Sequence, residues 1–314
     1  AFFVLIAEQE IRTSMEVSMK TIFFIGYKLD LYKDIKNYLC FMEIRPKKAL
    51  GQHFLRDGAT ALKIVKSLLR EEDLSIRERI PVVEVGPGTG VLTGLLLEDP
   101  TIDYYAVELD REAVSLLRQK YPHLSERLIE GDFLKLPATS LPDEFFLIGN
   151  FPYNISSQIF FRILEWRNAI PQVVGMVQKE VAERFCAGPG SRTYGILSVL
   201  LQTWYDIEYL FTVPPGVFVP PPKVNSGVIR LLRNNRTSLE CPESLFLKVI
   251  KTTFNKRRKT IRNSLRPLLG DKKILSSKLL DLRPEQLNIE EFIDLTLQVE
   301  AVLNADSLLL QDPS

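Results

Sequence analysis

The chain has 314 residues, of which 46% are hydrophobic and 25% are charged, with a formal net charge of +1. That length favours one large domain with a smaller one beside it. A net charge this close to zero does not itself indicate a nucleic-acid partner, so the distribution of charge has to be examined. The scattered Cys40, Cys186 and Cys241, like the distant pair His53 and His123, exclude the spacing of a disulfide framework or a zinc site. We therefore expect a reducing, cytoplasmic setting and no metal.

The first 41 residues differ from the rest. Their apolar runs, residues 2–7 and 21–25, are too short to span a bilayer. Charged residues follow the first run directly, and no small-residue cleavage pattern of a signal peptide is present. We interpret residues 1–41 as an extension outside the folded core, arising from a start codon placed too far upstream, and we expect no membrane partner.

Residues 80–85 are predicted to form a strand that runs into Gly86-Pro87-Gly88-Thr89-Gly90, with a helix following. Glycines spaced two apart let a ligand approach the backbone more closely than a Cβ atom would permit. The spacing is G-x-G-x-G and not the G-x-G-x-x-G of dinucleotide sites, which disfavours a dehydrogenase.

Polar residues also end the next three predicted strands. Glu108 ends the strand over residues 104–108, where a carboxylate is able to accept both hydroxyls of a ribose, while Asp110 suits a helix N-cap better. Asp132 follows the third strand, where it would accept a hydrogen bond from an adenine amine, and Asn150 follows the fourth. Each alone is explained more simply by a structural role. Together on one sheet edge they predict a ligand site.

Asn150-Phe151-Pro152-Tyr153 matches the Asn-x-Pro-aromatic motif of methyltransferases that modify amino groups of nucleic acids. The adenine amine is a poor nucleophile, because its lone pair is delocalised into the ring. The Asn150 amide oxygen and a backbone carbonyl of the turn would each accept one N–H and stabilise the charge that grows on the nitrogen. Pro152 would fix the turn, and Tyr153 would stack on an extruded base. The alternative is an ordinary strand-to-helix turn.

Residues 205–213 and 226–232 resemble the antiparallel pair that closes such a sheet. The proline-rich segment between them cannot be a central strand, and we expect Phe218 within it to flank the extruded base. Residues 188–193 are glycine-rich and are predicted to form a flexible lid beside the site.

Between Lys248 and Arg266 the predicted helical C-terminal region has eight Lys or Arg residues and no acid. Such one-sided charge indicates a surface for a phosphate backbone, and Lys256, Arg257 and Arg258 are the expected contacts. A solvated helix face is the alternative.

With these residues in place, the chain from about residue 45 to residue 302 resembles the small-subunit ribosomal RNA adenine N6,N6-dimethyltransferases. The resemblance rests on the combination of Gly51-Gln52-His53-Phe54-Leu55, Glu84-Val85-Gly86-Pro87-Gly88-Thr89-Gly90, Glu130-Gly131-Asp132-Phe133, Asn150-Phe151-Pro152-Tyr153-Asn154-Ile155-Ser156, Pro220-Pro221-Pro222-Lys223-Val224 and Phe254-Asn255-Lys256-Arg257-Arg258-Lys259-Thr260.

The resemblance implies an α/β fold. A Rossmann-like class I methyltransferase domain with a seven-stranded, mostly parallel sheet would span residues 42–235, and a small helical RNA-binding domain residues 236–314. It implies methyl transfer from S-adenosylmethionine to the N6 amines of two adjacent adenosines, in a hairpin loop near the 3′ end of small-subunit rRNA. The substrate would be the immature 30S subunit, the enzyme a monomer, and its role small-subunit biogenesis.

The resemblance also assigns roles to residues. Asn150, Pro152 and Tyr153 would be catalytic. The family's donor contacts would fall on His53, Leu55, Gly86, Gly88, Glu108, Asp132 and Asn150. Position 53 is often Asn in the family, and His53 keeps a polar side chain there.

Two other functions remain open. The related methylase that acts on large-subunit rRNA and confers antibiotic resistance shares the Asn150 to Tyr153 motif, although the long helical tail favours the small-subunit type. The chain also fits an rRNA-binding assembly factor whose catalysis is secondary.

Overall fold

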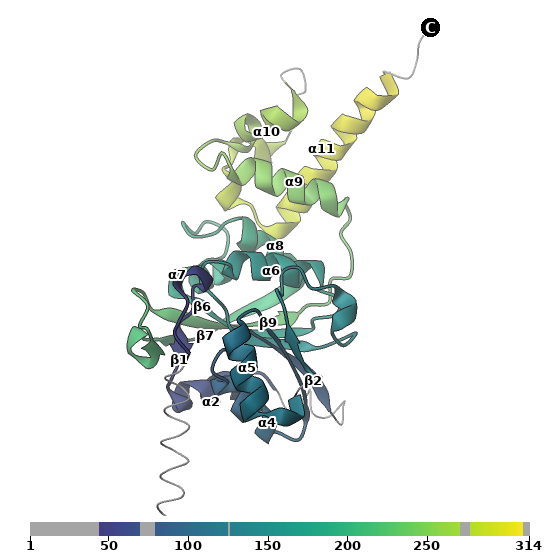
Figure 1. Ribbon diagram of the computed structural model, residues 1–314. Helices are drawn as coiled ribbons and strands as arrows, with labels where there is room; N and C mark the ends of the chain where they lie inside the picture. The colour runs from purple at the N-terminus through teal and green to yellow at the C-terminus, as the bar shows by residue number, and fades with distance from the viewer. Residues whose placement is uncertain (1–43, 70–78, 125, 271–276, 310–314) are drawn as a thin grey trace, which may run out of the picture. The chain divides into compact units, whose positions relative to one another are not determined.

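The computed structural model describes residues 44–69, 79–124, 126–270 and 277–309 (Figure 1). The predicted extension over residues 1–41 lies outside these ranges. From Pro46 onward the chain forms one compact unit.

A seven-stranded sheet is the centre of this unit, in the order β4-β3-β2-β5-β6-β9-β7. Neighbouring strands from β4 to β6 pair in parallel, whereas β9 is antiparallel to both β6 and β7. The predicted mostly parallel sheet and its antiparallel closing pair are therefore confirmed. The strands are β2 (Ile80–Val85), β3 (Ile102–Glu108), β4 (Leu128–Glu130), β5 (Phe146–Asn150), β6 (Gln172–Gln178), β7 (Tyr205–Val213) and β9 (Ser226–Arg233).

Helices cover both faces of the sheet, with α4 and α5 on one side and α6 and α8 on the other (Figure 1). Successive strand residues point to opposite faces, so Val82 joins one core cluster while Val83 and Val85 join the other. Burial on both faces explains why the central strands are continuous apolar runs. The helices are α2 (Gly58–Lys66), α4 (Val91–Glu98), α5 (Arg111–Lys120), α6 (Ser156–Glu165), α7 (Lys179–Cys186) and α8 (Ile196–Trp204).

A two-stranded ribbon pairs β1 (Phe54–Leu55) with β8 (Phe218–Val219) in antiparallel fashion. The segment before the first helix is thereby joined to the proline-rich segment before β9. Residues 49–54 are placed over the carboxyl ends of the parallel strands, where they line a cavity.

The C-terminal region contains α9 (Glu243–Phe254), α10 (Ile261–Leu269) and α11 (Ile289–Leu309). Its core cluster includes Phe246, Ile250 and Phe292, and it also contains Tyr194 and Val199 from the region before residue 235. The division into domains at 235/236 stays a prediction, because one apolar cluster contains residues from both sides of it.

Among the helices of the described ranges, none has the length and apolar character needed to cross a membrane. The same residues contain no group of three or more His, Cys, Asp or Glu side chains that would hold a metal ion.

Candidate active site

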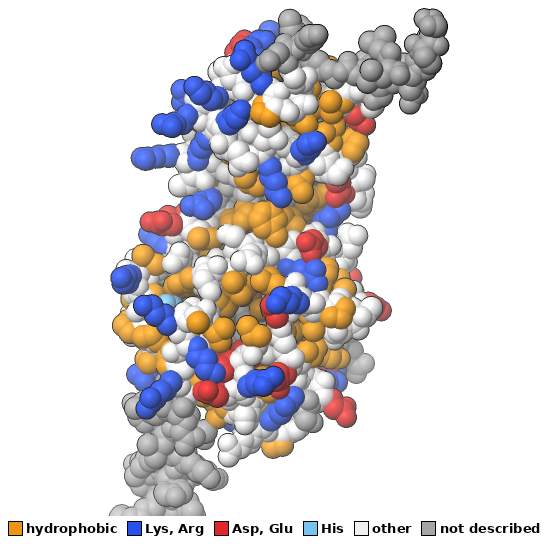
Figure 2. Space-filling model, turned by 45° about the horizontal axis from the view of Figure 1, so that its top comes forward, with side chains coloured by type: hydrophobic (Ala, Val, Ile, Leu, Met, Phe, Trp, Pro, Cys, Tyr) orange, Lys and Arg blue, Asp and Glu red, His pale blue; other side chains and the backbone are white. Residues whose placement is uncertain are grey.

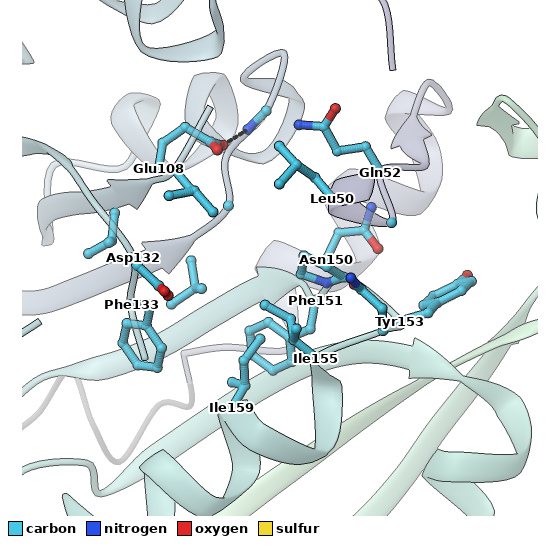
Figure 3. Close-up of a pocket in the computed structure, with 18 of the residues that line it drawn as sticks. Leu50, Gln52, Glu108, Asp132, Phe133, Asn150, Phe151, Tyr153, Ile155 and Ile159 are labelled. Carbon is cyan, nitrogen blue, oxygen red and sulfur yellow. Dashed lines mark hydrogen bonds between the residues drawn. The ribbon is translucent and has the colours of Figure 1, made fainter. Parts of the chain in front are cut away.

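A cavity of about 260 Å³ lies at the carboxyl ends of the parallel strands. Its lining includes the residues that directly follow β2, β3, β4 and β5. Glu108 and Asp132 lie on one side of it and Asn150 and Tyr153 on the other (Figure 3). Eight residues predicted for the site are brought together here, namely His53, Gly86, Gly88, Glu108, Asp132, Asn150, Pro152 and Tyr153.

Gly86 and Gly88 both have positive φ, 69° and 55°, a backbone conformation that L side chains rarely adopt. They differ in what a side chain would meet. A Cβ atom on Gly88 would come within 2.8 Å of the Phe54 ring, whereas one on Gly86 would meet no protein atom within 4 Å. Gly86 lines the cavity, so its missing side chain leaves room for a ligand against the backbone.

Glu108 is held by backbone N–H groups on both oxygens. Gly88 N donates to Oε2 at 2.9 Å (Figure 3), and Asp110 N donates to Oε1 at 2.8 Å. The side chain is only 5% exposed, and burial raises the pKa of the Glu108 carboxyl above its usual value. Each oxygen keeps a second lone pair for a hydroxyl group. Asp110 caps α5 by accepting from Glu112 N at 3.0 Å, which confirms its separate, structural assignment.

Asp132 also lines the cavity and is oriented locally. Its Oδ1 accepts a hydrogen bond from Leu134 N at 3.0 Å, and its Oδ2 lies 3.6 Å from Lys135 Nζ. These contacts fix the carboxylate just past the end of β4 and leave it lone pairs for an amine donor.

The Asn150 amide has a defined orientation. Its Nδ2 donates to the His53 backbone carbonyl at 2.8 Å. Because the nitrogen is used in this way, Oδ1 is the atom left to accept a hydrogen bond from a ligand. The His53 ring is itself held, with Nδ1 2.8 Å from the Pro220 carbonyl oxygen. The segment around His53 thus aims the Asn150 side chain.

Tyr153 lies beside His53, with ring centroids 5.3 Å apart and an interplanar angle of 30°. Its hydroxyl is 2.5 Å from Ser226 Oγ at the start of β9. Burial raises the pKa of the Tyr153 phenol, so the group is neutral at physiological pH. The ring lines the cavity next to Pro152 and Asn150.

Two predicted residues occupy other places. Leu55 is buried in the core; it does not line this cavity but a smaller neighbouring one of about 30 Å³, together with Gly86 and Asn150. Phe218 is 2% exposed and packs in the same core, because its strand β8 pairs with β1. Its ring is not available to a base, so the prediction that Phe218 flanks the extruded base is wrong.

The prediction that residues 188–193 form a lid beside the site is also wrong. Residues 188–193 do not line the cavity. Instead, Gly190 N donates to the Glu285 carbonyl at 2.6 Å, and the Ser191 carbonyl accepts from Arg257 Nη2 at 3.2 Å. The loop joins α7 and α8 to the C-terminal helical region and does not cover the active site.

The basic residues of the α9–α10 turn surround an open hollow of about 730 Å³, lined by Phe254, Asn255, Lys256, Arg257, Arg258, Lys259, Asn263 and Arg266. Blue side chains are numerous over this C-terminal region in Figure 2. Lys256 and Arg258 are exposed. Arg257 is 35% exposed and is engaged internally, since its Nε lies 3.7 Å from Glu285 Oε2 in addition to the Ser191 bond.

Further lining residues had no prediction from the sequence. Apolar side chains from four strand ends and from α6 complete the cavity, among them Leu109, Phe133, Leu134, Ile155 and Ile159. Of these residues, Leu109 is the one that the sequence could have indicated. It is a large apolar residue between two acids at a strand end, and its side chain is 49% exposed. Such exposure is expected where an apolar ligand surface remains to be covered.

The strand order, with its single antiparallel strand, and the glycine loop, acids and Asn-Pro turn at the strand ends define a class I methyltransferase. The chain belongs to the ribosomal RNA adenine dimethylase family, whose model matches residues 44–300.

Relatives within the family are similar over most of their length. The chain is 56% identical over 256 residues to ribosomal RNA small subunit methyltransferase A of Parabacteroides distasonis, covering 81% of this chain and 94% of the relative. The protein of the same name from Porphyromonas gingivalis is 52% identical over 268 residues, covering 82% of this chain and 99% of the relative.

Solved structures share the fold. A dimethyladenosine transferase from Plasmodium falciparum matches with a TM-score of 0.66 at 23% identity, over 80% of this chain and 98% of its own. The 23S rRNA methyltransferase ErmE matches with a TM-score of 0.56 at 25% identity, over 79% of this chain and 99% of its own.

Proposed function

We propose that this protein transfers methyl groups from S-adenosylmethionine to the N6 amines of two adjacent adenosines in the 3′-terminal hairpin loop of small-subunit rRNA, giving N6,N6-dimethyladenosine. The family implies S-adenosylmethionine as the methyl donor. The observation that carries the proposed chemistry is the orientation of Asn150, whose amide nitrogen is bonded to the His53 carbonyl and whose oxygen is thereby left to accept from the target amine.

The cavity has the groups that the donor requires. Glu108 offers carboxylate lone pairs for the ribose hydroxyls, and Asp132 offers an acceptor for the adenine amine of the donor. Gly86 leaves space beside the backbone, and apolar neighbours such as Phe133 and Leu109 suit the flat faces of a base. His53 contributes through its backbone carbonyl, which fixes Asn150, while Leu55 lines the smaller neighbouring cavity beside Gly86 and Asn150.

The donor supplies an electrophilic methyl group. As the target N6 forms its bond to carbon, the carbon–sulfur bond breaks and N6 releases a proton to water. The Asn150 oxygen and a backbone carbonyl of the Phe151–Pro152 turn accept the two N–H groups and so stabilise the positive charge on N6 in the transition state. Tyr153 gives the extruded base a stacking surface, and Pro152 holds the turn.

The RNA backbone is proposed to contact the exposed basic side chains of the α9–α10 turn, Lys256 and Arg258 among them. The physiological substrate is proposed to be the immature 30S subunit, with the enzyme acting as a monomer in the cytoplasm. An assembly role through rRNA binding alone would use this same surface.

Large-subunit rRNA is the second candidate substrate, because the ErmE structure shares the fold over 79% of this chain. The identity to small-subunit methyltransferases, 52–56%, is about twice the identity to ErmE, 25%, and favours the small subunit. Purified immature small and large subunits, each incubated with enzyme and methyl-labelled donor, test the choice. We expect label in small-subunit rRNA alone. Label confined to the large subunit would overturn the proposal.

A further inference from the structure

Two glycines lie side by side in the middle of the sheet, Gly149 in β5 and Gly175 in β6, and are paired in the strand register. Neither has a positive φ, so the backbone does not require glycine at either position. Glycine in a strand interior weakens the strand, and its presence indicates that another group approaches closely.

That group is the ring of Phe151. A Cβ atom on Gly175 would lie 2.5 Å from Phe151 Cε2 and 3.3 Å from Cζ, and one on Gly149 would lie 2.8 Å from Cε1. The ring is fully buried and meets Phe160 edge-on, with centroids 5.7 Å apart. The two missing side chains therefore form a slot that the ring fills.

The slot connects directly to the catalytic turn. Phe151 is the second residue of Asn150-Phe151-Pro152-Tyr153, and its N–H donates to the Met176 carbonyl at 3.0 Å, the residue after Gly175. The Phe151 ring packs against the two glycines, and the Phe151 backbone is hydrogen-bonded to the residue that follows one of them in β6. Any displacement of the ring would move the Asn150 amide and the turn carbonyl together.

We infer that Gly149 and Gly175 are positioning residues for methyl transfer: by leaving room for the Phe151 ring, they set the place of both acceptors of the target amine. The inference rests on the proposed function for the identity of the reaction. Positioning errors of about 1 Å at a reacting centre can reduce rates by about 10²-fold.

Gly175→Ala is the sharper test, because the three atoms nearest to its new methyl group belong to the Phe151 side chain, whereas Gly149→Ala would also meet the Val85 carbonyl at 2.6 Å. We expect Gly175→Ala to lower kcat for rRNA methylation by about 10²-fold. Calorimetric affinity for S-adenosylmethionine should be much less affected, since Glu108 ends β3 and Asp132 follows β4, whereas the two glycines lie in β5 and β6.

The decisive variant is the double change Gly175→Ala with Phe151→Leu. Leucine has no Cε or Cζ atoms, so it removes the atoms at 2.5 and 3.3 Å from the new methyl group. We expect it to restore most of the lost kcat. Ile64→Val is the control for general loss of stability, because it removes one methyl group from a fully buried side chain of the other core cluster. It should lower the unfolding temperature and leave kcat unchanged.

Normal kcat in Gly175→Ala, or a loss that Phe151→Leu does not relieve, would overturn the inference. So would an equal loss in Ile64→Val. The proposed function fails separately, if the wild-type enzyme does not methylate small-subunit particles. In that case the same variants are compared on whichever rRNA the wild type does methylate.

Discussion

Glu108 has two kinds of partner, which makes its substitution informative. Its oxygens already accept from Gly88 N and Asp110 N, and the remaining lone pairs are those proposed for the ribose of the donor. Glu108→Ala should weaken binding of S-adenosylmethionine by about 1.5–3 kcal/mol for each charge-assisted hydrogen bond lost. Calorimetry with the donor alone measures this. Thermal unfolding of the same variant serves as the control for a loosened glycine loop, and unchanged donor affinity would remove Glu108 from the site.

Tyr153 is expected to act through its ring. Tyr153→Ala should reduce turnover on RNA more than donor binding, because a stacking surface is worth about 1–3 kcal/mol per base. Tyr153→Phe should be much milder for turnover, although it leaves Ser226 Oγ without the phenol at 2.5 Å.

That lost hydrogen bond should appear in the unfolding free energy, at about 1–3 kcal/mol, because Ser226 is fully buried. Adding Ser226→Ala to Tyr153→Phe should recover part of the stability, since both polar partners are then removed. Equal loss of turnover in the Phe and Ala variants would instead assign Tyr153 a hydrogen-bonding role.

Glu84 provides a prediction about pH. It is fully buried beneath the glycine loop, where its Oε2 accepts from Thr93 Oγ1 and from the Tyr104 hydroxyl, each at 2.7 Å. Burial raises the pKa of Glu84 from 4.5 to about 7. The folded state thus binds the proton more tightly than the unfolded state, so the stabilisation is complete below pH 4.5 and is lost as pH rises to about 7.

Glu84→Gln keeps an oxygen acceptor and removes the titration. The wild-type free energy of unfolding, taken relative to this variant, should fall by about 3 kcal/mol from pH 4.5 to pH 7. Denaturant titrations across this range make the comparison. A difference that is constant, or that grows with pH, would contradict the assignment.

At the scale of elements, the basic side chains of the α9–α10 turn are of two kinds, exposed to solvent or engaged within the protein. Lys256 and Arg258 are exposed, whereas Arg257 contacts Glu285 and Ser191. Changing Lys256 and Arg258 to Gln should weaken RNA binding and reduce the slope of log K against log salt by about 1.4–1.8, at about 0.7–0.9 per phosphate contact.

Arg257→Gln is the matched comparison for that pair. Because its guanidinium is engaged within the protein, it should lower the unfolding temperature and leave the salt slope unchanged. Filter binding at several salt concentrations supplies the slopes. If the double variant does not alter the salt slope, the turn is a solvated face. If Arg257→Gln lowers the salt slope, Arg257 contacts RNA, as the sequence predicted.

The sequence predicts those elements whose pattern lies within a few consecutive residues. The glycine loop, Glu108, Asp132 and the Asn150 turn each follow an apolar strand, and parallel strands bring such ends together. Helix α8 had no prediction, because a short run that is apolar on all sides fits a buried helix or a buried strand equally well.

The predictions that were wrong have a different cause, which is contact between segments that lie far apart in the sequence. Phe218 is buried because β8 pairs with β1, more than 150 residues earlier, and the 188–193 loop is held by Glu285 and Arg257. Neither contact leaves a pattern in the neighbouring sequence. The slot for Phe151 was hidden for the same reason, since Gly149 and Gly175 become neighbours only in the sheet.

For the whole molecule, the central claim is that the sheet edge and the basic C-terminal region serve one reaction on small-subunit rRNA. Asn150→Ala tests the two separately, because it removes the proposed acceptor of the target amine, which lines the sheet-edge cavity, and leaves the basic turn unchanged. Losing one such preorganised group costs about 10²–10³ in rate.

The most direct measurement is nucleoside analysis of the 3′-terminal hairpin of small-subunit rRNA, after reaction of immature 30S particles with wild-type enzyme and with Asn150→Ala. We predict N6,N6-dimethyladenosine at two adjacent positions with the wild type. With Asn150→Ala we predict almost none, although the variant still binds the particles. Near-normal dimethylation by Asn150→Ala, or no dimethyladenosine in that hairpin with the wild type, would contradict the claim.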